Sequence, residues 1–134
     1  MKVFRNVIAV LLGIVVGGFA NMGIISISDK VIPLPEGIDP SSMESLAASM
    51  HLFQAQNFLM PFLAHALGTF SGAWLTVLVA ASRKSMLAMI VGIFFLIGGV
   101  INVFMLPAPF WFSFLDLFLA YLPMAFLASK MVKR

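Results

Sequence analysis

Four strongly polar side chains stand inside long apolar stretches of this 134-residue sequence: Asn21, His65, Asn102 and Asp116. An imidazole and a carboxylate can exchange a proton, and amide groups can donate and accept hydrogen bonds beside them. Ionisable residues in apolar segments are costly to insert into lipid and often mark ion pathways or proton relays. These four residues are therefore the candidate polar site of the sequence.

Several other chemistries are disfavoured. One histidine and one carboxylate supply too few metal ligands, and no second histidine follows His65 three or four positions later. The sequence has no cysteine, no phosphate-binding loop and no nucleophile–base motif. We therefore assign no catalytic residue, metal or cofactor. An intramembrane enzyme is the least favoured function, although His65 and Asp116 leave it open.

The composition indicates an integral membrane protein. Hydrophobic residues make up 62% of the chain and charged residues 10%, and the mean hydropathy is +1.10. A soluble domain is roughly half apolar and about a quarter charged. Such a chain could not cover its surface with polar groups in water, whereas a lipid bilayer solvates apolar side chains. The bilayer is therefore its expected partner.

Four stretches are apolar enough for a spanning helix, which needs about 20 residues. They run roughly over 6–28, 58–81, 86–106 and 110–129. Short links at 82–85 and 107–109 separate the last three stretches, and short links make neighbouring helices antiparallel. The sequence therefore predicts one all-α transmembrane domain over 1–134, an antiparallel bundle of four transmembrane helices.

An external loop over 29–57 joins the first two spans. Its first part contains three prolines and should be extended. Apolar residues then recur at helical spacing, which predicts a short amphipathic helix over roughly 42–54. Ser41 and Glu44 fit a capping box at its start.

The basic residues set the expected orientation. One side of the bundle carries Lys2, Arg5, Arg83, Lys84, Lys130, Lys133 and Arg134, and only Lys30 falls on the other. The positive-inside rule then places both termini in the cytoplasm. No run exceeds two adjacent basic residues, so we expect no nucleic-acid partner.

A cleaved signal peptide is the rival interpretation of the N-terminus. Lys2 and Arg5 give a basic start, and 18–20 offers a small-x-small cleavage pattern. The apolar character continues past this pattern to Ile27. We therefore favour a retained first span.

Small residues recur at four-residue spacing along three of the spans. The stripes are Gly13, Gly17 and Asn21; Ala64, Gly68 and Gly72; and Gly98 and Asn102. Small residues at this spacing let helix backbones approach closely, so the asparagines should lie at helix contacts. In the fourth span, Pro123 predicts a kink, and the hydroxyl of Tyr121 needs a partner.

The four polar residues share a similar expected depth. At 1.5 Å per residue, Asn21, His65 and Asp116 lie roughly 9–10 Å, and Asn102 about 6 Å, below the outer helix ends. All four therefore fall within the outer half of a hydrocarbon core about 30 Å thick. They could hydrogen-bond between helices as structural contacts, or they could line a pocket that handles ions or protons.

Two stretches carry a resemblance to a family. They run over 61–73, which includes His65, and over 99–109, and they are followed by Asp116 and by the Ala-Tyr-Leu-Pro run at 120–123. The chain resembles a family of uncharacterised small four-helix bacterial inner-membrane proteins. The resemblance implies a multi-pass protein of the bacterial cytoplasmic membrane. It implies no activity, substrate or cofactor.

Two function classes follow. The first is an accessory or structural subunit, or a small membrane scaffold, because the chain is small and its helices carry glycine-rich faces. The alternative is a small transporter, channel or ion- or proton-coupled component that uses a polar pocket in the outer half of the bundle. Four helices barely enclose a pathway, so such a protein should form a homo-oligomer or join a larger membrane complex.

Overall fold

The computed structural model describes residues 1–132, and every regular element in that range is a helix. The elements are α1 (Lys2–Val31), α2 (Met43–Ser49), η1 (Met50–Leu52), η2 (Ala55–Phe58), α3 (Leu59–Val79), α4 (Lys84–Met105), α5 (Phe110–Leu119) and α6 (Leu122–Met131). Four helical segments are long and apolar enough to cross a membrane: Lys2–Val31, Ala55–Val79, Lys84–Met105 and Phe110–Met131. The prediction of an all-helical chain with four such segments is confirmed.

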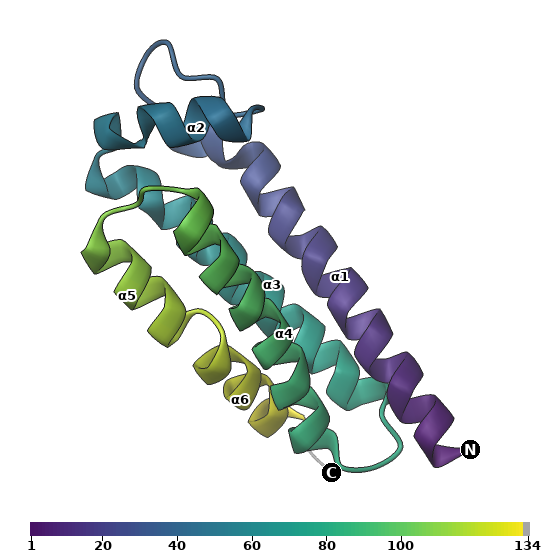
Figure 1. Cartoon of the computed structure of the whole chain (residues 1–134). Coiled ribbons are helices and arrows are strands. Elements are labelled where there is room, and N and C mark those ends of the chain that lie inside the picture. Colours follow the sequence, from purple (N-terminus) through teal and green to yellow (C-terminus); the bar gives the residue numbers. More distant parts are fainter. Residues whose placement is uncertain (133–134) are drawn as a thin grey trace.

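Helix α3 is the centre of the arrangement. It packs along α1 on one side and against α4 and α6 on the other, and α4 also contacts α6. Of the residues in an 18-residue apolar window, 44% are buried in the segment that contains α3, and 17% are buried in α1. Figure 1 shows α1 and α3 side by side, with the N-terminus and the visible end of α6 at one end of the molecule and α2 at the other. We call these the terminal end and the loop end.

Glycines bring the backbones of α1 and α3 together. A Cβ atom added to Gly72 would lie 2.5 Å from the carbonyl oxygen of Gly13, and one added to Gly68 would lie 2.9 Å from that of Gly17. Real Cβ atoms do not approach backbone so closely, so only glycine fits at these contacts. This glycine interface uses the stripes that the sequence predicts on the first two spans.

The third span packs on a different glycine from the expected one. A Cβ atom added to Gly98 would meet nothing within 4 Å, so Gly98 makes no close helix contact within residues 1–132. One added to Gly99 would lie 2.5 Å from the Tyr121 hydroxyl, and one added to Gly92 would lie 2.7 Å from the Ala125 side chain. Neighbouring helix positions differ by about 100° around the axis, so a shift of one residue selects another face.

The turn between α3 and α4 is held by the start of α1. The side-chain oxygen of Asn6 accepts hydrogen bonds from the backbone N–H groups of Ala81 (2.9 Å) and Ser82 (3.2 Å). Its amide nitrogen donates to the Ser82 hydroxyl (3.0 Å). Arg83 completes the turn in the left-handed region, with φ 50°. This contact, the Asn6 clasp, fixes the terminal end of the molecule.

The fourth span is two helices and not one kinked helix. Helix α5 ends at Leu119 and α6 begins at Leu122, so the chain breaks before the predicted kink site. Pro123 then lies in the first turn of α6, where its missing N–H leaves no helical bond unmade. The break leaves Tyr121 in a non-helical backbone conformation between the two helices.

The connection at the loop end is less regular than predicted. The expected helix over 42–54 is α2 followed by one 3₁₀ turn, η1, and its capping residue is Ser42, not Ser41; a second 3₁₀ turn, η2, leads into α3. The Ser42 hydroxyl accepts from the backbone N–H of Ser45 (3.3 Å). Beyond α2, Met50 is buried beside Phe58 and Phe112, which ties the connection to α5.

Candidate polar site

An imidazole–carboxylate pair joins α3 to α5. The Nδ1 atom of His65 lies 2.8 Å and 3.0 Å from the two carboxylate oxygens of Asp116. The two side chains are 15% and 6% exposed, respectively. With an ionised carboxylate, Nδ1 carries the hydrogen and donates it; with a protonated carboxyl group, Nδ1 can accept. The pair can therefore hold one proton in more than one position.

The helix break adds a third member to this pair. The Tyr121 hydroxyl donates to Asp116 Oδ2 (3.2 Å), and its ring stacks on the His65 ring with centroids 5.7 Å apart. Tyr121 is 3% exposed, so its hydroxyl needs a partner inside the protein. A continuous helix would place residue 121 on a different face from the observed one. The break thus completes a His65–Asp116–Tyr121 network.

A cavity of about 230 Å³ adjoins this network. Its lining residues come from α1, α3, α4 and the α5–α6 link: Asn21, His65, Thr69, Phe95, Gly98, Gly99, Asn102 and Tyr121. Three of the four polar residues singled out in the sequence therefore line one cavity. The fourth, Asp116, lies behind it and binds two of the lining residues, His65 and Tyr121.

Two buried polar atoms at the cavity have no hydrogen-bond partner among the described residues. They are the side-chain oxygen of Asn21 and the hydroxyl of Thr69. Thr69 is 0% exposed. Buried polar groups in proteins nearly always have a partner. A water molecule occupies about 30 Å³ of liquid, so the cavity has room for several waters or for one small solute that would satisfy these atoms.

Sequence reasoning missed Thr69 and Phe95 as site residues. Thr69 stands one helical turn after His65, so its place on the same face of α3 was available from spacing alone. Threonine is common in membrane helices, however, where its hydroxyl usually bonds its own backbone. Phe95 carried no signal that distinguishes it among 14 phenylalanines.

Among residues 1–132, no lysine or arginine lines the cavity, and the carboxylate joined to the lining by hydrogen bonds is Asp116. Nδ1 of His65 is committed to that carboxylate, so Nε2 is the ring nitrogen left for an occupant of the cavity. Between residues 1 and 132 no three His, Cys, Asp or Glu side chains group together as metal ligands would. The site is thus equipped for hydrogen bonding and proton exchange.

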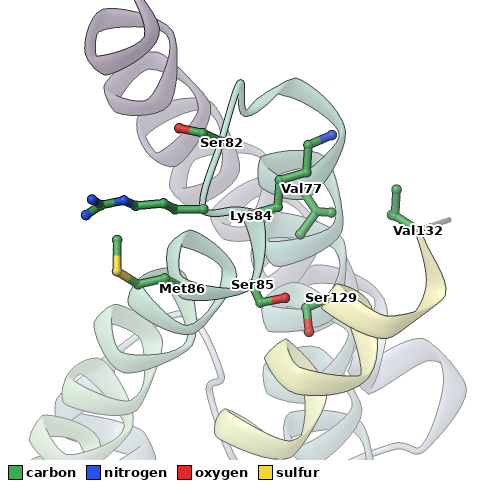
Figure 2. Close-up of a pocket in the computed structure, with 8 residues that line it drawn as sticks. Val77, Ser82, Lys84, Ser85, Met86, Ser129 and Val132 are labelled. Atoms are coloured by element: carbon green, nitrogen blue, oxygen red, sulfur yellow. The ribbon is translucent and has the colours of Figure 1, made fainter. Parts of the chain in front are cut away.

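A larger hollow of about 630 Å³ lies at the terminal end (Figure 2). Its lining includes Ser82, Arg83, Lys84 and the hydroxyls of Ser85 and Ser129. Figure 2 shows the Lys84 side chain extending away from the two serines. None of the four predicted polar residues lines this hollow, so it does not share the chemistry of the His65–Asp116 pair.

Comparisons with protein-family models, with curated proteins and with solved structures gave no match to the chain. The site must therefore be interpreted from its own geometry.

Proposed function

We propose that this chain is a proton-coupled solute-binding component of the bacterial cytoplasmic membrane, with its binding pocket inside the bundle. The pocket is the cavity beside the His65–Asp116–Tyr121 network. One observation carries the proposal: Asn21 and Thr69, which line this cavity, have buried side-chain oxygens without a hydrogen-bond partner among the described residues. A purely structural polar contact would satisfy its buried groups, because an unmade buried hydrogen bond costs about 1–3 kcal/mol.

The proposed membrane topology is an antiparallel bundle of four spans with both termini in the cytoplasm. Basic residues at the terminal end support this orientation, since Lys2, Arg5, Arg83 and Lys84 gather there. The pocket then opens toward the outer half of the membrane. In this setting α2 lies on the external side, and the α5 face that exposes Phe110, Phe114 and Phe118 lies against lipid.

The absence of cysteine makes a direct accessibility test possible. Thr69→Cys places a thiol at the cavity lining, and Val91→Cys is the matched control because Val91 lies in a packed core cluster and does not line the cavity. A membrane-impermeant thiol reagent applied to intact cells should modify Thr69→Cys and leave Val91→Cys unmodified.

Two results would contradict parts of the proposal. Equal protection of both thiols, from either side of the membrane, would show a dry bundle and remove the binding function. Modification of Thr69→Cys only from the cytoplasmic side of inverted vesicles would reverse the proposed orientation. Ser41→Cys in the connection serves as the positive control for external exposure.

A structural subunit of a larger membrane complex is the second candidate. The stacked ladder of Phe110, Phe114 and Phe118 favours it, with ring centroids 6.2 Å and 5.8 Å apart on an exposed face. Such a face suits a second copy or another membrane protein as well as lipid. Native mass spectrometry of the protein released from bilayer discs would distinguish a monomer from a homo-oligomer or a hetero-complex.

A further inference from the structure

The cavity offers hydrogen-bond acceptors and aromatic rings, and the amide groups of Asn21 and Asn102 can both donate and accept. The Asn21 and Thr69 oxygens are buried without a partner. The Tyr121 hydroxyl gives its hydrogen to Asp116, so it offers no donor to the cavity. Phe95 and Tyr121 add aromatic rings to the lining, and ring faces attract cations.

The charge of the site points the same way. Asp116 lies directly behind His65 and Tyr121, and no lysine or arginine of residues 1–132 lines the cavity. With one proton fewer than a neutral pair, the His65–Asp116 pair carries one negative charge. An anion would then enter a low-dielectric site beside a carboxylate without any fixed cation to compensate it, which is strongly unfavourable. The negative charge of the His65–Asp116 pair would compensate a single positive charge on an occupant of the cavity.

We propose that the cavity binds a small, singly charged ammonium-type cation, ammonium itself or a short primary amine. Its N–H groups would donate to the Thr69 and Asn21 oxygens, and its charge would be balanced by Asp116 through His65 and Tyr121. The volume of about 230 Å³ is below the roughly 300–1,000 Å³ of pockets for drug-sized ligands, which favours a small cation. This inference rests on the proposed binding function of the pocket.

Thermal unfolding of the purified full-length protein in detergent tests this inference. Methylammonium chloride should raise Tm in a saturable manner, because a ligand that binds only the folded state stabilises it. N-methylglucamine chloride at the same ionic strength is too large for the cavity and should leave Tm unchanged.

Two isosteric variants on α3 make the test specific. Thr69→Val removes a cavity oxygen, so it should weaken the apparent methylammonium affinity by at least about tenfold, equivalent to one cavity hydrogen bond, without lowering Tm in its absence. Thr76→Val should lower Tm in the absence of ligand and keep the methylammonium shift, because Thr76 does not line the cavity. If methylammonium raised the Tm of Thr69→Val as much as that of the wild type, at the same concentrations, the inference would be overturned.

The outcomes also separate this inference from the proposed function. If neutral acetamide stabilises the wild type and methylammonium does not, the pocket binds neutral solutes and the cation inference is wrong, while the binding function stands. If neither compound shifts Tm and the thiol of Thr69→Cys is unreactive, the pocket itself is wrong and both proposals fall.

Discussion

Thr69 and Thr76 lie on the same face of α3, two helical turns apart, and both are 0% exposed. The Thr76 hydroxyl reaches the carbonyl oxygens of Gly72 on its own helix (2.9 Å) and Ala9 on α1 (3.1 Å). The Thr69 hydroxyl reaches neither helix. Two identical side chains on one helix thus have opposite hydrogen-bonding status.

The surroundings of the two hydroxyls differ. Around Thr76, the glycine interface draws α1 against α3, so a backbone carbonyl of α1 comes within reach. Around Thr69, α1 and α3 still touch through Gly17 and Gly68, but Thr69 itself lines the cavity that His65 and Asn21 share. The buried hydroxyl of Thr76 joins two helices, whereas that of Thr69 has no protein partner. The following substitutions test this contrast between a closed and an open region.

Asp116→Leu should have the largest effect. It leaves the donors of His65 and Tyr121 buried without their acceptor, which should cost about 3 kcal/mol of unfolding free energy. Asp116→Asn keeps an acceptor and should restore most of this stability while abolishing the methylammonium shift. Reversible unfolding in mixed detergent–dodecyl sulfate micelles measures both. Wild-type stability in Asp116→Leu would show that the network is not formed.

Gly72→Ala should cause the next largest loss of unfolding free energy. The added Cβ would lie 2.5 Å from the Gly13 carbonyl oxygen and 3.2 Å from the Gly17 Cα atom. Overpacking of this kind destabilises by roughly 1–3 kcal/mol, measured by the same unfolding assay. Gly18→Ala is the matched control, because its Cβ would meet nothing within 4 Å. Equal behaviour of the two variants would show that α1 and α3 do not touch.

Thr76→Val should have an intermediate effect. It keeps the shape of the side chain and removes a hydroxyl that donates to Ala9 and Gly72. A typical net hydrogen-bond contribution predicts a loss of about 0.5–1.5 kcal/mol. Denaturant titration should show a lower midpoint with an unchanged slope. A higher midpoint would mean that the closed region does not depend on this bond.

Thr69→Val should have the smallest effect on stability. Its hydroxyl has no protein partner to lose, so the change in unfolding free energy should be near zero or slightly stabilising, within about 0.5 kcal/mol. The thermal unfolding midpoint without ligand checks this. A loss as large as that in Thr76→Val would show that the two hydroxyls are bonded alike, and the contrast between open and closed regions would disappear.

The gross arrangement was predictable because length and hydropathy are enough to locate long apolar helices. Hydropathy and length located the four apolar helical segments, and the depth of each polar residue suggested a common layer. The structure places Asn21, His65 and Asn102 along one cavity, with Asp116 behind it. The depth of a residue depends only on the rise per residue, so it can be computed without knowing the orientation of each helix about its own axis.

Details that depend on rotation and local backbone were not predictable. Gly98 and Gly99 are indistinguishable by hydropathy, yet only Gly99 contacts Tyr121. The break before Leu122 lies upstream of the expected kink, because a proline fits equally well in the first turn of a new helix. The Tyr121 hydroxyl reaches Asp116 because of that break, and no sequence pattern predicted the break.

The Asn6 clasp has a consequence for biosynthesis. Asn6 and Ser82 are 76 positions apart, and Ala9 and Thr76 are 67 apart. Because α1 is synthesised before α3, its glycine face enters the proposed membrane long before the surface that covers it exists. The contacts of α1 with α3 and with the α3–α4 turn can therefore form only after residue 82 has been synthesised. Assembly is completed by the earliest helix docking onto a later one, so a nascent chain halted before this turn would leave α1 unattached and open to other partners.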